Sequence, residues 1–436
     1  MRHLSTAILA VTLIIAACGD PSSGDPGDGS DEGLSGRVQV LVIGDAHEAA
    51  AYGDLVAAFE DQAPGIDVEL VTASDRNDQM TRLSTSFSAG RPPDLFVMNY
   101  RFVGQFAERD VLVPLDELVA GSEAMGEADF YQAALDAFRF DQGLLCLPQN
   151  LSSLVVYYNK DLFAEEGVTE PEENWQWMDF VEKAKVLTKD LDGDQHPDQY
   201  GIGIEAGQII RLAPFIWSAG AELVDDQEHP TRFELDSPEA RAVLGNYFAL
   251  RRAHQVIPTE EEVQAESDEA RFINGRTAML VESRRVVPIL RSITEFDWDV
   301  APLPLFGTQQ GVLHSDGYCM TRDGTNQDAA WRFMEFALGE EGATIMAQTG
   351  RTVPSRIAVA ESDAFLDPDA KPVNSQVFID AGPNLRSLPH ISTWPEIEAE
   401  ASPILESAMY HDLPPETLNE LLMGATGHLF EPAAQD

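Results

Sequence analysis

Residues 190–198 carry a cluster of aspartates at regular spacing. Four of them occupy the first, third, fifth and ninth positions of the segment, namely Asp190, Asp192, Asp194 and Asp198. This spacing matches the first part of a calcium-binding loop, in which carboxylate oxygens wrap a divalent ion. Two positions depart from the pattern, because Gln195 stands where a glycine makes the turn and Gly201 stands where a glutamate closes the site. The segment predicts either a structural Ca²⁺ site or a solvated polar loop.

Motifs for the common catalytic chemistries are absent from the sequence. No Gly-Lys pair could build a phosphate-binding loop, no H-E-x-x-H could bind zinc, and no G-x-S-x-G turn could carry a nucleophile. The nine histidines show no ligand spacing, and among 74 acidic residues paired carboxylates arise by chance. We therefore expect no catalytic residues, no cofactor beyond a structural Ca²⁺, and a protein that is not an enzyme.

Cys18 stands where its thiol could be acylated. It follows an apolar run at residues 6–17, which is shorter than the ~20 residues of a membrane span. Residues 15–19 (IAACG) resemble a bacterial lipobox, although an ordinary signal with an incidental cysteine is the alternative. We expect a lipoprotein signal peptide over 1–17, then an acylated Cys18 and a flexible acidic tether over 18–36. The protein would then be extracytoplasmic and lipid-anchored to the bacterial cell membrane.

Cys146 and Cys319 are the remaining cysteines. No C-x-x-C motif is present, which removes support for zinc or redox chemistry. In an oxidising compartment the two cysteines form a disulfide or remain as buried thiols, and the sequence leaves both outcomes open.

The beginning of the globular part, residues 38–99, alternates between strand and helix patterns. Strands are predicted at 38–43, 66–71 and 94–99, with helices over 52–59 and 80–87 between them. This βαβαβ order predicts parallel strands with the first strand between the other two. The ligand site of such a sheet lies at the carboxyl ends of the first and third strands. The candidate binding residues at those ends are Asp45, His47, Asn99 and Tyr100.

The rest of the chain mixes both patterns. Helices are predicted at 177–187, 211–219, 238–254, 329–338 and 397–430, the last broken at Pro403 and at 414–415. Strands are predicted at 144–147, 154–158, 201–205, 278–281 and 298–304.

Charge narrows the range of partners. The chain has 436 residues and a net charge of −46, which disfavours binding to nucleic acid. A neutral or cationic solute is easier to accept than an anionic one. A hydrophobic content of 44% supports a sizeable core in one large or two medium domains.

Several motifs follow one another in a recognisable order. They are RPPDL (91–95), GLLCLP (143–148), LVVYYNKDLF (154–163), DGD (192–194), WSAGAEL (217–223), FINGRTAM (272–279) and DVAPLP (299–304). Their order and spacing resemble the extracellular solute-binding proteins of family 1, the carbohydrate-binding lipoproteins of ABC importers related to maltose-binding protein. Ala221 departs from the family pattern, which has a glycine there.

The resemblance implies a fold and a division of the chain. The fold is α/β, the two-lobed periplasmic-binding-protein fold of type II, in which each lobe is a mostly parallel sheet flanked by helices and a hinge joins the lobes. Lobe 1 would comprise 37–149 and 316–358, and lobe 2 would comprise 150–315 and 359–436. Cys146 and Cys319 would both lie near hinge crossings, where a disulfide could join adjacent strands.

The resemblance also implies further ligand-binding residues. Aromatic platforms and planar polar groups suit a sugar, which presents hydroxyls and an apolar face. The residues added on this basis are Tyr158, Trp217, Glu282, Arg284, Asp316, Tyr318 and Trp394. Tyr158 and Trp217 are equally well explained as core aromatics.

The function implied is that of a membrane-anchored, monomeric receptor that binds a sugar or oligosaccharide by hinge closure and delivers it to ABC permease subunits. The alternatives are a receptor for a non-sugar solute, such as a polyamine or a glycerol-phosphate type of ligand, and a secreted glycoside hydrolase. A hydrolase would need two carboxylates at ~5–10 Å across the cleft.

Overall fold

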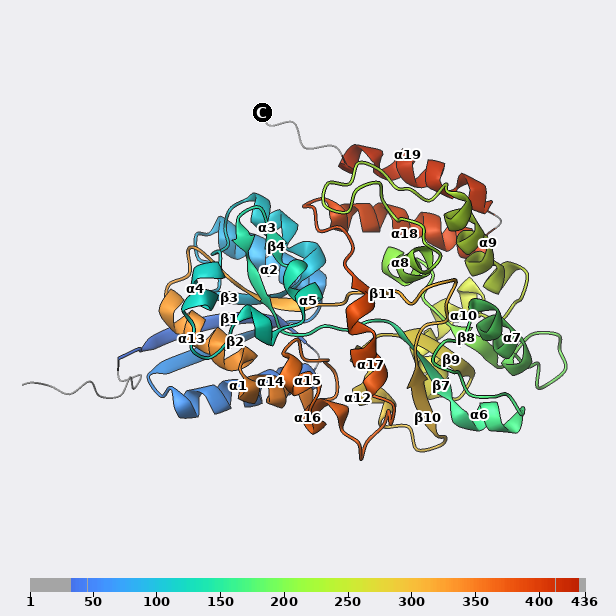
Figure 1. Cartoon of the computed structure of the whole chain (residues 1–436), viewed down its shortest axis with the longest axis horizontal. Coiled ribbons are helices and arrows are strands. Elements are labelled where there is room, and N and C mark those ends of the chain that lie inside the picture. The colour runs from blue at the N-terminus through green and yellow to red at the C-terminus, as the bar shows by residue number, and fades with distance from the viewer. Residues whose placement is uncertain (1–32, 45, 412, 431–436) are drawn as a thin grey trace, which may run out of the picture. The chain divides into compact units, whose positions relative to one another are not determined.

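A computed structural model describes residues 33–44, 46–411 and 413–430 of the chain, with the side chains of Ala46 and His47 left out (Figure 1). The expected signal peptide, Cys18, most of the tether, and Asp45 lie outside the described residues. Within the described part, no helix has both the length and the apolar character that crossing a membrane requires.

The first sheet contains both the N-terminal strands and two strands from much later in the chain. Its order is β2 (Ile66–Ala73), β1 (Gly36–Ile43), β3 (Leu95–Asn99), β12 (Asp316–Met320) and β6 (Cys146–Pro148). As the βαβαβ pattern predicted, β1 lies between β2 and β3 and is parallel to both. We call the part of the chain built on this sheet lobe 1.

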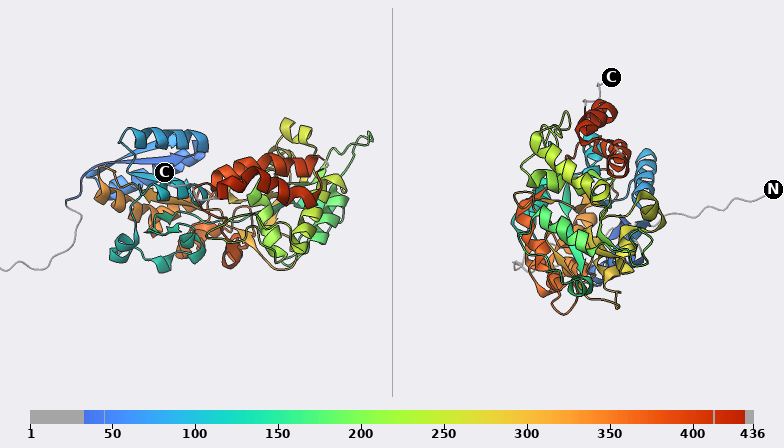
Figure 2. Two further views of the ribbon diagram at one scale, coloured as in Figure 1. Left: turned by 90° about the horizontal axis from the view of Figure 1, so that it is seen from above. Right: turned by 90° about the vertical axis from the view of Figure 1, so that its right-hand side faces the viewer.

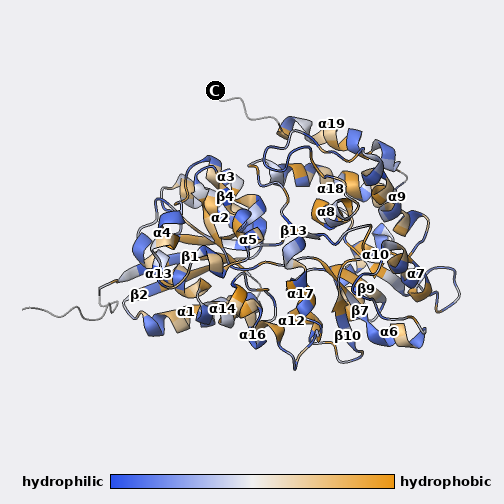
Figure 3. Ribbon diagram, viewed as in Figure 1, coloured by the Kyte–Doolittle hydropathy of each residue, from blue (hydrophilic) through white to orange (hydrophobic). Residues whose placement is uncertain are grey.

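The second sheet, on which lobe 2 is built, is formed by the middle of the chain. Its order is β10 (Trp298–Ala301), β7 (Val155–Asn159), β9 (Thr277–Glu282) and β8 (Tyr200–Gly203). Mostly hydrophobic residues form the strands of both sheets, whereas the helices around them carry polar and apolar residues (Figure 3).

Both sheets are mixed, which corrects the expectation of mostly parallel sheets. β12 is antiparallel to β3 and β6, and β7 is antiparallel to β9 and β10, whereas β8 and β9 are parallel. The chain leaves lobe 1 through β6 and returns through β12, and it enters lobe 2 through β7 and leaves through β10. A strand that returns beside the strand that left must run in the opposite direction, and the sequence pattern carries no signal for this.

Helices surround the sheets. Before β7 they are α1 (Ala46–Gln62), α2 (Arg76–Ser88), η1 (Tyr100–Phe102), α3 (Gly104–Glu108), α4 (Asp116–Gly121), η2 (Glu127–Asp129) and α5 (Gln132–Asp136). Between β7 and β12 they are α6 (Lys160–Glu165), α7 (Trp177–Leu187), α8 (Ile209–Ser218), α9 (Pro238–Arg252), α10 (Glu260–Ala265), α11 (Asp268–Ile273), η3 (Arg284–Val286) and α12 (Val287–Leu290). After β12 they are α13 (Gln327–Leu338), α14 (Glu340–Ala347), α15 (Ile357–Ala360), α16 (Asp363–Leu366), α17 (Gln376–Asp380), η4 (Gly382–Asn384), α18 (Trp394–Tyr410), η5 (Pro415–Thr417) and α19 (Leu418–Phe430). Two short ribbons, β4 (Arg139–Phe140) with β5 (Gly143–Leu144) and β11 (Gly311–Val312) with β13 (Leu385–Arg386), complete the fold.

The C-terminal helices belong to lobe 2. α18 and α19 lie side by side in the views of Figures 1 and 2, and α18 packs on α8 and α9. The sequence predicted a break at Pro403, but α18 continues through it. A proline inside a helix removes one backbone hydrogen bond, at a cost of ~3 kcal/mol. The buried face of α18, which includes Ile397 and Leu405, offsets this cost by packing.

Three segments connect the lobes, and we call them the crossing segments: residues 149–154, 311–315 and 385–388. The first two pair through Ser152 and His314, whose backbone groups exchange hydrogen bonds of 2.8 and 2.9 Å. The third pairs with the second through β11 and β13. The second crossing segment therefore lies between the other two in this hydrogen-bonded arrangement.

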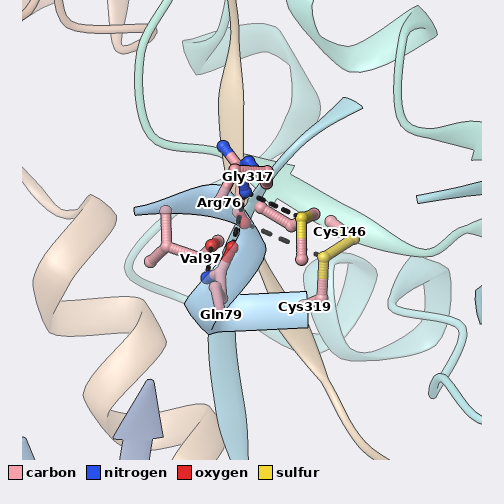
Figure 4. Close-up of a disulfide and its surroundings, with 7 residues drawn as sticks. Arg76, Gln79, Val97, Cys146, Gly317 and Cys319 are labelled. Atoms are coloured by element: carbon pink, nitrogen blue, oxygen red, sulfur yellow. Dashed lines mark hydrogen bonds between the residues drawn. A yellow bond between two sulfur atoms is a disulfide. The ribbon is translucent and has the colours of Figure 1, made fainter. Parts of the chain in front are cut away.

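Cys146 and Cys319 form a disulfide at the base of the crossings (Figure 4). They lie directly opposite each other on β6 and β12, with Cα atoms 4.3 Å apart. Both cysteines are fully buried. Arg76 and Gln79 of α2 lie nearby (Figure 4). Of the two outcomes that the sequence left open, the disulfide is the one found. It closes a loop that contains all of the second sheet.

Breaking this disulfide is expected to destabilise the protein strongly. Its cysteines are 173 positions apart, and the loop-entropy estimate for a ring of this size is about 5 kcal/mol. We expect the Cys146→Ser/Cys319→Ser double variant to have a lower free energy of unfolding than the wild type, by a large part of the ~5 kcal/mol. Urea denaturation under oxidising conditions measures the difference.

Dithiothreitol provides the control for this experiment. It should lower the stability of the wild-type chain and leave the double variant unchanged. Equal stability of the two chains without reductant would show that the loop constraint contributes nothing.

Candidate functional site

Asn99, at the carboxyl end of β3, orients an arginine toward lobe 2. Its Oδ1 accepts hydrogen bonds from the Arg101 backbone N–H at 3.4 Å and from Arg101 Nε at 3.1 Å. Arg101 then donates two hydrogen bonds from Nη1 to Glu398 on α18, at 2.6 and 2.8 Å. Both partners are largely buried. The strand end that topology selected is thus joined directly to lobe 2.

Asp316 is the first residue of β12, where it pairs with Asn99 at the end of β3. Its carboxylate lies 3.6 Å from the Arg76 guanidinium, and its backbone N–H donates to Asn150 Oδ1 at 2.9 Å. Arg76 also lies 4.9 Å over the Phe102 ring. Two of the predicted residues, Asn99 and Asp316, therefore belong to one polar group, the lobe 1 group, with Arg76 and Arg101.

The polar residues of lobe 2 gather at the carboxyl end of β9. Glu282 is 5% exposed and accepts from Arg211 Nη2 at 2.6 Å and from Arg285 Nη2 at 2.8 Å. Arg211 also lies 3.4 Å from Glu205, and Arg285 lies 3.3 Å from Glu269. We call these five residues the lobe 2 group.

The Glu282 carboxyl group is held in its charged form. Burial alone would raise its pKa, but Arg211, Arg285 and the Ser283 N–H outweigh burial and lower the pKa to about 2. A buried pair of this kind is costly to break, because the remaining partner keeps an uncompensated charge.

His314 lies between the two groups, on the second crossing segment. The residues on either side of it are fastened to lobe 1, because the Tyr100 hydroxyl donates to the Leu313 carbonyl at 3.2 Å and the Tyr100 N–H donates to the Ser315 carbonyl at 3.2 Å. Its strand partner Ser152 accepts from the Arg284 N–H at 3.4 Å, which brings the end of β9 to the same place.

The electrostatics of His314 agree with this position. Burial, helped by the charges of Arg211, Arg101 and Arg285 and opposed by that of Glu282, lowers its pKa to about 3. Charges from both lobes therefore act on this imidazole, which is neutral near pH 7. We call the lobe 1 group, the lobe 2 group and His314 together the junction cluster.

The aromatic rings among the predicted ligand-binding residues are packed inside the protein. All five are at most 5% exposed: Tyr100, Tyr158, Trp217, Tyr318 and Trp394. Trp394 packs between Phe233 and Phe430, and Arg386 covers the ring of Trp217 at 4.6 Å. The sequence could not reveal this, because a buried aromatic and a platform have the same residue type.

Two of these tyrosines also have structural partners. The Tyr158 hydroxyl donates to Glu170 at 2.9 Å, and Tyr318 packs edge-on against Phe333. Tyr100 has a different role, because its hydroxyl, which donates to the Leu313 carbonyl, also accepts from the Leu388 N–H at 2.9 Å. It thereby fastens two crossing segments to lobe 1.

Arg284, also among the predicted ligand-binding residues, lies outside the junction cluster. Its side chain is fully buried, donating from Nε to the Gly350 carbonyl at 2.8 Å and from Nη1 to Ser375 Oγ at 3.1 Å. The guanidinium also lies over the rings of Phe365 and Phe378. β9 ends at Glu282 and the 3-10 turn η3 begins at Arg284, so the chain stops alternating as a strand there, and Arg285, three residues after Glu282, lies beside it in place of Arg284. Asp45 and the His47 side chain lie outside the described residues.

The sequence analysis missed Arg76, Arg101, Arg211, Arg285 and His314 as members of one cluster. Arg101 directly follows the selected end of β3, so the topology argument needed only one more residue to include it. His314 had no such signal, because a lone histidine in a loop pattern has no ligand spacing.

The acidic loop brings three of its four aspartates together. Single carboxylate oxygens of Asp190, Asp192 and Asp194 lie within 4.8 Å of one another, all exposed. Gln195 adopts a φ of 74°, so it makes the left-handed turn expected of glycine. Asp198 Oδ2 instead accepts from the Leu191 N–H at 2.7 Å. Backbone N–H groups lower the pKa of Asp190. Ca²⁺ binding at this loop stays a prediction.

A small cavity lies beside the first crossing segment. Its volume is about 20 Å³, and Ser153, Gln310 and Asn384 contribute its polar lining. A volume of this order holds about one water molecule, far less than a sugar needs.

Asp268 stands behind the lobe 2 group, at the first position of α11. It is 9% exposed, and its Oδ1 has no hydrogen-bond partner in the structure. Burial raises its pKa to about 6, against the opposing charge of Arg271. Glu205 and Arg211 also act on it. Its titration and that of Glu282 therefore shift in opposite directions.

Replacing Glu282 by Gln is expected to lower the free energy of unfolding by about 3 kcal/mol at pH 7, because Arg211 stays buried beside only the exposed Glu205. The folded-state pKa is lowered, so this stabilisation is complete above about pH 4.5 and is lost as pH falls toward 2. Urea unfolding at pH 7 and pH 3 should show the difference between the two chains shrinking in acid. Glu222→Gln, which removes an exposed pair with Arg386, should cost under about 1 kcal/mol and serves as the control.

Replacing Asp268 by Asn should change the pH dependence of stability in the opposite direction to the Glu282 substitution. The folded-state pKa is about 6, so the folded wild type holds a proton that the unfolded chain releases above ~3.9. Wild-type stability therefore falls as pH rises from about 4 to about 6, by up to roughly 3 kcal/mol. The variant should lack this fall in urea unfolding series across that range. Parallel pH profiles for the two chains would contradict the assignment.

Comparison with known proteins places this arrangement in a family. Residues 44–344 match the family described as bacterial extracellular solute-binding protein. A binding protein of Brucella abortus is 24% identical over 380 residues, which cover 86% of this chain and 88% of the relative.

Solved structures show the same fold. An ABC substrate-binding protein from Listeria monocytogenes in complex with cycloalternan superimposes with a TM-score of 0.81 at 23% identity, covering 91% of this chain and 99% of that one. An ABC transporter solute-binding protein from Thermotoga lettingae bound with α-D-tagatose gives a TM-score of 0.77 at 19% identity, covering 91% and 100%. The two-lobed fold is therefore confirmed, and the chain belongs to the family of bacterial extracellular solute-binding proteins.

Proposed function

We propose that the protein is the solute receptor of an ABC importer and that it captures an uncharged sugar or oligosaccharide at the junction cluster. Cys18 would carry the lipid anchor, and permease subunits would receive the ligand. The lipobox-like segment and the family support the anchor and the permease. The family and the similar structures, which bind cycloalternan and α-D-tagatose, support the sugar.

The observation that carries the choice of a neutral ligand is the pairing of charges. Five arginines at and beside the junction cluster face six carboxylates among the described residues. The pairs are Arg76–Asp316, Arg101–Glu398, Arg211–Glu282 with Glu205, Arg285–Glu282 with Glu269, and Arg351–Glu48. A protein of net charge −46 thus keeps this region nearly balanced. Paired charges offer directed hydrogen bonds to hydroxyls without a net field for an ion.

This pairing weighs against the charged alternatives. A phosphate-bearing ligand would need arginines that are not already committed to carboxylates, and a polyamine would need a surplus of carboxylates. A glycoside hydrolase would need a protonated acid beside a second carboxylate, whereas two arginines hold Glu282 in its charged form. The family and the similar structures consist of binding proteins.

Hinge closure is the mechanism that fits the connections between the lobes. Among the described residues, the crossing segments and side-chain contacts such as Arg101 with Glu398 join the two lobes. A ligand that contacts both polar groups would stabilise the closed arrangement by its differential affinity for it.

A sugar panel tests the function directly. D-glucose, D-galactose, D-tagatose, maltose and maltotriose would each be added at 5 mM, and the melting temperature would be measured. A ligand at about 100 times its Kd adds about 2.7 kcal/mol of stability, which is a measurable rise.

Spermidine and glycerol 3-phosphate serve as charged comparisons in the same panel, and chromatography of the sugars after incubation checks for turnover. Stabilisation by a charged compound alone, or hydrolysis of a sugar, would overturn the proposal.

A further inference from the structure

Two buried nitrogen atoms of the junction cluster have no hydrogen-bond partner. They are Nε2 of His314 and Nε of Arg211, and each is closed off from solvent in the structure. Leaving a buried polar atom unpaired costs about 1–3 kcal/mol, so an unpaired atom in a native protein calls for an explanation. These two atoms come from different places, the second crossing segment and α8 of lobe 2.

The rest of each side chain is already positioned. Arg211 uses Nη1 to donate to the Val281 carbonyl at 3.2 Å and Nη2 to donate to Glu282 at 2.6 Å and Glu205 at 3.4 Å, so Nε is its one nitrogen without a partner. The backbone of His314 is fastened on one side to Ser152 and on the other, through Leu313 and Ser315, to Tyr100. The Arg211 side chain cannot turn far without breaking its contacts, and the backbone that carries His314 is fixed on both sides.

A hydroxyl group matches both atoms. Arg211 Nε can only donate, so its partner must offer an acceptor. His314 is neutral near pH 7, and its Nε2 either donates or accepts according to the tautomer. A sugar hydroxyl both donates and accepts, so it satisfies His314 in either tautomer, whereas a carboxylate or an ammonium group satisfies only one.

We propose that His314 Nε2 and Arg211 Nε bind hydroxyl groups of the captured sugar and that His314 thereby determines specificity. This inference rests on the proposed function. The two atoms become accessible while the lobes are apart, and closure then seals the hydroxyls against them. A hydrogen bond sealed from water discriminates strongly against a ligand that lacks the matching group, because the protein atom is left unpaired.

Two substitutions of His314 separate hydrogen bonding from shape. His314→Leu removes the nitrogen and keeps the bulk, and His314→Gln keeps a hydrogen-bonding atom at a similar reach. Titration calorimetry with the panel sugar that raises the wild-type melting temperature most should show at least tenfold weaker binding for His314→Leu. His314→Gln should stay within about threefold of the wild type.

Tyr200→Phe is the matched control, because it removes a hydroxyl that donates to Glu262 in lobe 2, outside the junction cluster. It should leave the affinity unchanged. The melting temperature of each ligand-free variant shows whether the fold is retained, and His314→Gln keeps the test decisive where His314→Leu unfolds.

The outcomes separate this inference from the function itself. Wild-type affinity in both His314 variants, with the sugar still bound, would overturn the role of His314 and leave the receptor function intact. An equal loss in His314→Leu and His314→Gln would also overturn it, because shape alone would then explain the effect. A wild-type chain that binds none of the five sugars would contradict the proposed function first.

Discussion

The antiparallel pairing of β6 with β12 is the constraint on which the rest of the structure depends. The chain leaves lobe 1 along β6, builds all of the second sheet, and returns along β12 beside the strand on which it left. The Cys146–Cys319 disulfide locks this pairing at its base. Because departure and return are adjacent, the first two crossing segments pair through Ser152 and His314. The junction cluster exists only because this pairing brings the end of β3, the end of β9 and His314 to one place.

The sequence predicted the parts of the fold that local pattern and topology control. The βαβαβ order of residues 38–99, the central position of β1, and helix α7 all follow from residue periodicity. The antiparallel strands did not follow, because their direction is set by contacts between residues far apart in the chain, such as Gly317 with Pro148 and Met279 with Tyr158. Pro403 failed as a helix breaker for a similar reason, since tertiary packing of α18 outweighs its local cost.

The candidate site was predictable to the extent that it lies at strand ends. Asn99, Asp316 and Glu282 were found because topology or the family resemblance places them there. The burial of the aromatic residues was not predictable, because residue type alone does not distinguish a platform from a core ring, and Trp394 and Trp217 prove to be covered. The arginines were missed for the opposite reason. In an acidic chain each looks like a surface residue, and only the folded structure shows that Arg211 and Arg285 share a buried carboxylate, Glu282.

The pairing of these arginines gives the overall charge of −46 a more specific meaning. A carboxylate such as Glu282 can be buried at the junction only with cations beside it, because desolvation would otherwise return it to its neutral form. Arg211 and Arg285 supply these cations. Few of their N–H donors then remain for a ligand, and those that remain have fixed directions. The exposed acids elsewhere need no such partners. The same chain is thus strongly acidic on its surface and nearly balanced at the junction. A ligand that brings hydroxyls fits that balance, whereas a ligand that brings a net charge would have to displace a pair that the fold already needs.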